Sequence, residues 1–175
     1  ASNLTANDSN GAVTDIFVRD IAAGTTTLVS VSTGGGSGDA GSSGASISGN
    51  GRYVVFQSDA TNLVAGDSNG ATDIFVRDLQ TNTTTRVSTA TDGSQSNDLS
   101  GQAVISADGR YVVFFSLASN LVQGDTNGLR DIFLKDMVTG NVTRLSVAAD
   151  GSELNDLSNT PSISADGHYV TFQTQ

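Results

Sequence analysis

The feature that most constrains this chain is a repeat with a period of 58 residues. Aspartate, tyrosine and phenylalanine recur at this spacing: Asp15, Asp73 and Asp131; Tyr53, Tyr111 and Tyr169; Phe56, Phe114 and Phe172. The period is kept with almost no drift along all 175 residues. A fixed period of this kind indicates one structural unit used several times, with each unit burying its apolar surface against its neighbours.

Each period is predicted to hold four short strands and no helix, because no segment has apolar residues at helical spacing. In the best-preserved period the strands are expected at 103–106, 110–116, 131–137 and 142–147. The pair Asp108-Gly109 between the first two predicts a type I′ hairpin turn. Segment 110–116 is apolar on both faces, which predicts a strand covered on both sides.

A four-stranded unit covered on both faces and repeated at a fixed interval is typical of a propeller blade. A flat solenoid is the alternative, but β-helix coils are much shorter than 58 residues. With the strands of a blade lettered a to d from the inside outward, the order along the chain is cd-abcd-abcd-ab. Residues 1–175 are therefore expected to form one all-β domain with two complete blades and two half blades.

The predicted half blades lie at the two ends of the sequence. The first would consist of a c strand at 15–20 and a d strand at 26–31. The last would consist of an a strand at 162–164 and a b strand at 168–173, and the complete blades would start near Ala45 and Ala103.

The segment from Ser106 to Phe114, followed by 131–136 and 142–146, resembles the WD40-like PD40 repeat. That repeat builds the β-propeller of TolB-type and many secreted bacterial proteins, and the resemblance covers essentially the whole chain. It implies a propeller fold and a secreted or periplasmic location. It implies no particular activity, because propellers host many unrelated functions.

Composition excludes several partners. The formal net charge is -10 and the pI is about 4.1, so the chain lacks the basic surface that nucleic acid or an anionic membrane requires. No apolar run approaches the roughly 18 residues of a membrane-spanning helix. Cysteine is absent, and the acidic Ser/Thr/Asn/Gly-rich composition is typical of secreted or periplasmic bacterial proteins. The chain begins with Ala1, which indicates a mature, excised or engineered segment.

The turn before each c strand carries oxygen ligands in the pattern Asp-x-Asn-Gly-x-x-Asp. The three copies are Asp67, Asn69 and Asp73; Asp125, Asn127 and Asp131; and, with one inserted residue, Asp8, Asn10 and Asp15. Carboxylate and amide oxygens suit Ca²⁺, so these turns are candidate calcium sites. The alternative is structural, because Asp and Asn side chains at a turn can accept hydrogen bonds from nearby backbone N–H groups.

No residue set predicts catalysis. The only histidine, His168, stands where Arg52 and Arg110 stand in other copies, and no serine lies in a Gly-x-Ser-x-Gly elbow. The carboxylates repeat in the manner of structural residues. Arg19, Arg77 and Lys135 share one repeat position and are expected to form structural pairs at blade edges. The Asp/Gly loops at 92–98 and 150–156 are interpreted as connectors.

These patterns favour a non-catalytic scaffold that assembles with itself and presents its faces to a protein or a glycan. The last b strand would pair with the first c strand of a second copy, with Phe17, Phe172 and Tyr169 packed in the composite blade. A twofold homodimer would then close six blades. Alternatives are a head-to-tail filament, a fragment of a longer chain, or a ligand-binding, glycan-binding or hydrolytic module with its site on the propeller axis.

Overall fold

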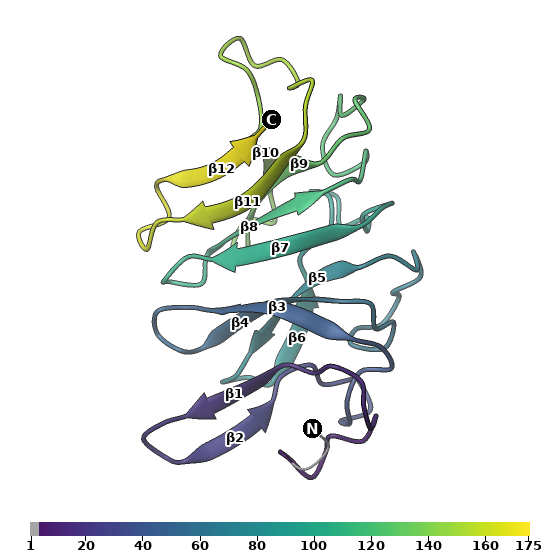
Figure 1. The fold of residues 1–175 in the computed structure, drawn as a ribbon, viewed down its shortest axis with the longest axis vertical. Coiled ribbons are helices and arrows are strands. Elements are labelled where there is room, and N and C mark those ends of the chain that lie inside the picture. Colours follow the sequence, from purple (N-terminus) through teal and green to yellow (C-terminus); the bar gives the residue numbers. More distant parts are fainter. Residues whose placement is uncertain (1–3) are drawn as a thin grey trace.

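The computed structural model describes residues 4–175 as twelve β-strands in antiparallel sheets (Figure 1). The strands are β1 (Phe17–Asp20), β2 (Thr25–Leu28), β3 (Ser42–Ile47), β4 (Tyr53–Ser58), β5 (Asp73–Asp78), β6 (Thr83–Arg86), β7 (Ser100–Ile105), β8 (Tyr111–Ser116), β9 (Asp131–Asp136), β10 (Val142–Arg144), β11 (Ser158–Ile163) and β12 (Val170–Thr174). Within the described residues no helix is long and apolar enough to cross a membrane.

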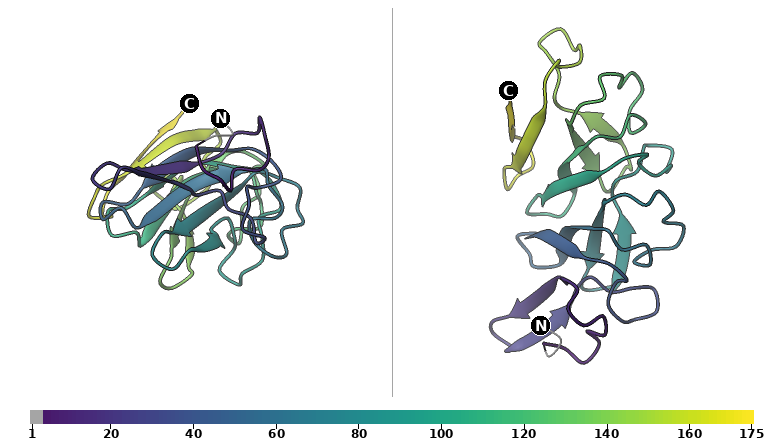
Figure 2. Two further views of the ribbon diagram at one scale, coloured as in Figure 1. Left: turned by 90° about the horizontal axis from the view of Figure 1, so that it is seen from below. Right: turned by 45° about the vertical axis from the view of Figure 1, so that its right-hand side comes forward.

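The strands form two four-stranded sheets flanked by two two-stranded sheets. Their orders are β1-β2, β3-β4-β5-β6, β7-β8-β9-β10 and β11-β12. The sheets follow one another along the long axis, with the two ends of the chain at opposite ends (Figures 1 and 2). The predicted all-β class and its four-stranded antiparallel sheets are confirmed.

The second and third strands of each complete sheet form the centre of the core. Strand β4 pairs with β5 and β8 pairs with β9 over six residues each, in the same register. This register places Phe56 opposite Phe75 and Phe114 opposite Phe133, and all four rings are fully buried. The ring centroids are 5.9 and 6.0 Å apart. Residues on both faces of these strands are buried, because each four-stranded sheet is covered by its neighbours, as the sequence pattern predicted.

The first strand of each sheet begins earlier than predicted. Strands β3, β7 and β11 start at Ser42, Ser100 and Ser158, whereas the sequence placed the starts near residues 45, 103 and 162. Each strand contains a bulge, which shifts its register against the following strand. The bulge breaks the two-residue alternation that marks a strand in a sequence.

Other predicted boundaries also change. Strand β1 starts at Phe17 rather than at residue 15, and β2 spans Thr25–Leu28 rather than 26–31. Strand β10 ends at Arg144, and Val147 instead forms an isolated bridge with Glu153.

The prediction of a type I′ turn at Asp108-Gly109 is wrong. Only the glycine has a positive φ, of 78°, whereas a type I′ turn needs positive φ at both central residues. The Gly109 N–H donates to the Ser106 carbonyl, and the Asp108 carboxylate accepts hydrogen bonds from the Ser106 hydroxyl and from the Arg110 N–H. The connection is therefore longer than two residues, and its aspartate acts as a hydrogen-bond acceptor.

Candidate functional site

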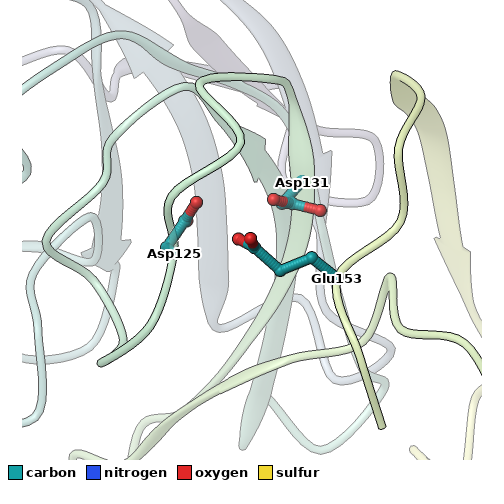
Figure 3. Close-up of side chains that lie close together, drawn as sticks. All are labelled: Asp125, Asp131 and Glu153. Carbon is teal, nitrogen blue, oxygen red and sulfur yellow. The ribbon is translucent and has the colours of Figure 1, made fainter. Parts of the chain in front are cut away.

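Three carboxylates meet at one end of the β7–β10 sheet. Asp131 is the first residue of β9, Asp125 lies in the loop before it, and Glu153 lies in the loop after β10. Figure 3 shows the three side chains pointing toward one another. One oxygen of each lies within 4.8 Å of the others. Asp125 and Asp131 are buried, so their negative charges need a compensating partner.

The guanidinium of Arg144 supplies that charge. Its Nη1 lies 2.6 Å from Glu153 Oε1, 3.5 Å from Asp125 Oδ1 and 3.6 Å from Asp131 Oδ2. Glu153 also accepts hydrogen bonds from the backbone N–H and the hydroxyl of Thr126, both at 2.8 Å. An arginine thus occupies the middle of the cluster in which a cation was predicted.

Asp131 is held by neutral donors as well. The Ser146 hydroxyl donates to its Oδ1, and Asn127 Nδ2 donates to its Oδ2 at 3.3 Å. Asn127 also donates to the Leu154 carbonyl and accepts from the Leu129 N–H. The aspartate and asparagine of the motif therefore connect β9 to the turn before it and to the loop after β10.

The second copy repeats this arrangement around Asp73, which is fully buried. Arg86 Nη1 lies 3.1 Å from Asp67 Oδ1 and 3.8 Å from Asp73 Oδ2. The hydroxyls of Ser88 and Ser96 both donate to Asp73 Oδ1. The carboxylate pair is again bridged by an arginine.

The first copy differs because Leu28 stands at the repeat position of Arg86 and Arg144. Asp15 accepts a hydrogen bond from the Ser30 hydroxyl at 2.6 Å. Asp8 is also buried. Within the described residues, Asp15 Oδ2 and Asn10 Oδ1 are buried without a hydrogen-bond partner. This turn thus retains the oxygen atoms of the motif but lacks the arginine.

Burial and charge separate the pKa values of the third cluster. Burial, with the nearby Asp131 charge, raises the pKa of Asp125 to about 6. Hydrogen bonds from Thr126 and the contact with Arg144 lower the pKa of Glu153 to about 2. In the second copy, burial and Asp73 raise the pKa of Asp67. The Glu153 carboxylate is therefore fully charged at neutral pH, whereas the Asp125 carboxyl titrates near neutral pH.

The predicted ligands of the second and third motifs are brought together, but their main partners were missed. The motif does not include Arg86 or Arg144, and Glu153 lies in a loop that the sequence predicts to be a connector. The two arginines stand 58 residues apart, directly after the d-strand threonines, and this spacing was the available signal. Whether the turns bind calcium stays a prediction.

Arg19, Arg77 and Lys135, the basic residues at the blade edges, contact neutral groups rather than carboxylates. Asp78 and Asp136 pair with Arg52 and Arg110, across the b–c strand pair, and not with the preceding residues. Arg19 and Arg77 instead donate to Thr26 and Thr84. Lys135 is buried, and its Nζ donates to the carbonyls of Thr89 and Ala90 in the loop after β6. The two arginine–aspartate pairs lower the pKa of each aspartate.

We expect Arg144→Leu to lower the free energy of unfolding by about 3–5 kcal/mol, because it leaves buried carboxylates without a countercharge. The substitution reproduces the residue found in the first copy. Urea denaturation at neutral pH measures the loss. Gln123→Leu changes an exposed side chain in the loop before β9 and serves as the control, with an expected change within about 0.5 kcal/mol. Equal effects of the two substitutions would contradict a bridging role for Arg144.

The raised pKa of Asp125 predicts a pH-dependent contribution to stability. The native state holds this proton more tightly than the unfolded chain, so the contribution is present below about pH 4 and is lost as pH rises through about 6. Asp125→Asn should remove this loss. Urea denaturation at several pH values between 4 and 7 measures the difference between the variant and the parent. A difference in unfolding free energy between variant and parent that stays the same at every pH would contradict a raised pKa of Asp125.

Comparison with solved structures identifies the fold. The chain matches TolB from Acinetobacter baumannii with 20% identity and a TM-score of 0.52, over 90% of this chain and 31% of that one. It matches a TolB-like protein from Agrobacterium tumefaciens with 21% identity and a TM-score of 0.54, over 92% and 50%. It also matches the tricorn protease with 16% identity and a TM-score of 0.55, over 90% and 13%.

No protein-family model matches the sequence, and no curated protein matches it. The chain spans about a third to a half of the TolB-type chains that it matches. The similarity bears out the predicted resemblance at the level of fold: the four-stranded sheets of this chain are arranged as in TolB-type β-propellers.

Proposed function

We propose that the protein is a non-catalytic propeller scaffold that assembles with itself through its two outermost strands. The observation that carries the proposal is that β1 and β12 each pair with only one strand among the described residues, whereas their equivalents pair on both sides. The equivalents of β1 are β5 and β9, and the equivalents of β12 are β4 and β8. Since b and c strands pair within the complete sheets, β12 of one copy is complementary to β1 of another.

Residue exposure supports this pairing. Phe17 and Phe172 are half-buried, while their equivalents in the complete sheets are fully buried against each other. The register of β4 with β5 places Phe172 of one copy opposite Phe17 of the second. An unpaired strand edge of this kind is a ready template for strand addition. The expected contact would bury apolar rings and form a ladder of main-chain hydrogen bonds.

A symmetric dimer satisfies both edges at once. Each copy contributes two complete sheets, and the two composite sheets bring the total to six, within the usual range for closed propellers. Twofold symmetry makes the two junctions equivalent. A filament would use the same junction without closing.

The polar groups of the chain favour a scaffold over an enzyme. The buried carboxylates of the second and third copies are engaged by arginine, serine and asparagine. The only histidine is 76% exposed and contacts Asp166 at 3.3 Å. We propose a secreted or periplasmic protein whose faces contact a protein or glycan partner. A ligand-binding or hydrolytic site on the propeller axis is the alternative function.

The oligomeric state tests the assembly. Light scattering should give twice the mass of one 17.8 kDa chain, and Phe17→Asp should give monomers because it places a charge in the composite core. Val138→Asp is the control, since Val138 is 75% exposed at a turn of a complete sheet, and it should leave the dimer intact. A parent chain that is monomeric at high concentration would overturn the proposal. A mass that grows with concentration would favour the filament.

Calcium is a second proposal, and it is strongest for the first copy. Its turn retains buried oxygen atoms without hydrogen-bond partners and has Leu28 where the other copies have arginine. Because hard cations prefer oxygen ligands, Asp8, Asn10 and Asp15 could hold Ca²⁺ with backbone carbonyls and water. In the other two turns an ion would compete with the guanidinium.

Thermal melting with calcium or with a chelator tests this proposal. We expect calcium to raise the midpoint of the parent chain, since a ligand of the native state stabilises it. Leu28→Arg should abolish the shift by supplying the missing guanidinium. An unchanged midpoint in the parent would exclude a calcium site in the first turn, and a shift that survives in Leu28→Arg would place the ion elsewhere.

A further inference from the structure

We infer that a groove beside β1 and β2 receives Tyr169 of a second copy, and that His168 of that copy pairs there with Asp20, so that association tightens as pH falls. This inference rests on the proposed self-association. It adds the chemistry of the junction and a proton-dependent control that strand pairing alone does not include.

The groove lies between the β1–β2 hairpin and the turn that joins β3 to β4. Its volume is about 420 Å³, and its lining includes Asp20, Thr25, Thr27, Asn50 and Gly51. A corresponding groove of about 260 Å³ occurs one repeat later, lined by the equivalent residues Asp78, Thr83, Thr85, Asp108 and Gly109. The later groove also contains Tyr53. No residue of the first groove takes the place of that tyrosine.

Tyr53 and Tyr111 each pack on a glycine of the following repeat. A Cβ added to Gly109 would overlap the ring of Tyr53, and one added to Gly167 would lie 2.7 Å from Tyr111 Cδ2. Gly51 is the equivalent glycine of the first groove, and a Cβ added to it would meet no atom within 4 Å. Tyr169 is the equivalent tyrosine of the last repeat, and it is 74% exposed. Gly51 thus has space for a tyrosine ring, and Tyr169 has no glycine to pack on within its own chain. A second copy would bring the two together in the same contact.

Backbone contacts between neighbouring sheets support the same junction. The Gly49 N–H donates to the Ala107 carbonyl at 3.0 Å, and the Ala107 N–H donates to the Ala165 carbonyl at 3.1 Å. These residues recur at the period of 58. The next member of the series would be the Ala165 N–H donating to the Gly49 carbonyl of the second copy. The strand pairing, the tyrosine contact and this hydrogen bond therefore require the same placement of the partner.

The residue before each tyrosine pairs with an aspartate of the adjacent c strand. Arg52 contacts Asp78 through two hydrogen bonds of 3.0 and 2.6 Å, and Arg110 contacts Asp136 at 3.3 and 2.9 Å. In the last repeat this residue is His168, and the aspartate of the expected partner strand is Asp20. The Asp20 carboxylate accepts a hydrogen bond from the Ala23 N–H at 2.8 Å and is otherwise exposed. Histidine therefore replaces the permanently charged arginine only at the junction between copies.

Two carboxylates would lie beside His168 in the assembly. Asp166 of its own turn lies 3.3 Å from Nδ1, and Asp20 of the second copy would approach from the other side. Tyr169 contributes a ring beside it, as Tyr53 does 4.8 Å from the Arg52 guanidinium. The nearby cations of the second copy are engaged elsewhere, Arg52 by Asp78 and Arg19 by Thr26.

The direction of the pH dependence follows from these charges. Imidazole changes its charge between pH 5 and 8, and only the protonated form pairs with a carboxylate. Because the assembled state gains Asp20 as a partner for the charged form, assembly takes up protons. The dissociation constant should therefore fall as pH falls. A partly exposed ion pair gives a roughly two- to fivefold effect, and two junctions in a dimer give about 4- to 25-fold.

The test is the dissociation constant of the full chain at about pH 5.5 and about pH 8, measured by sedimentation. We expect tighter association at the lower pH for the parent, whereas His168→Arg and Asp20→Asn should show little pH dependence. His168→Arg should also associate tightly at both values, since it restores the pair of the other repeats. Both variants retain Asp125, so its titration is common to all the chains compared.

Two controls locate the effect. Asp166 shares a repeat position with Asn50, which accepts the equivalent hydrogen bonds in the turn between β3 and β4. Asp166→Asn should therefore keep the turn intact, and the pH dependence should persist in this variant. Gly51→Val should weaken association by filling the groove, while Gly66→Val, at a similar positive φ outside the groove, should not. A dimer whose dissociation constant is the same at both pH values would overturn the His168–Asp20 pair and leave the proposed assembly standing. The absence of any dimer would overturn both.

Discussion

The pairing of the second and third strands in each sheet is the interaction on which the rest of the structure depends. It packs Phe56 against Phe75 and Phe114 against Phe133 at the centre of the core. It also aligns Arg52 with Asp78 and Arg110 with Asp136 at one end of the strands. Because these strands are buried on both faces, the sheets cannot stand alone and must be covered by their neighbours. The same dependence makes an unpaired c or b strand a strong candidate for pairing with another chain.

The charged clusters show how one repeated motif takes different chemical forms. Asp73 and Asp131 start equivalent strands and are tied to equivalent serines, and each has an arginine beside it. The first copy keeps the acidic residues but has Leu28 in place of the arginine. At the other end of the strands, the last copy has His168 in place of arginine. Both exchanges remove a permanent positive charge. The calcium proposal rests on the exchange at Leu28, and the proposed pH dependence rests on the exchange at His168.

The period and the apolar pattern made the fold predictable. Strands buried on both faces, such as β8, are recognisable because apolar residues fill successive positions. The bulged β7 was placed too late, since its irregular backbone disrupts that pattern. The ligands around Asp131 were predicted from their spacing in one short motif. Arg144 and Glu153 were missed because they lie outside that motif, on β10 and in the loop after it, and the pairing of β10 with β9 brings them to the cluster.

The most direct test of the central claim is the register of the strand junction between copies. The pairing of Val55 with Val76 predicts that Thr171 of one copy lies opposite Val18 of the other. The chain has no cysteine, so Val18→Cys and Thr171→Cys chains can be mixed and oxidised with no other thiol present. A disulfide-linked dimer is expected in the mixture, and none with either variant alone. The absence of this dimer from the mixture, or equal linking of Val18→Cys chains to one another, would contradict the pairing of β12 with β1 of a second copy.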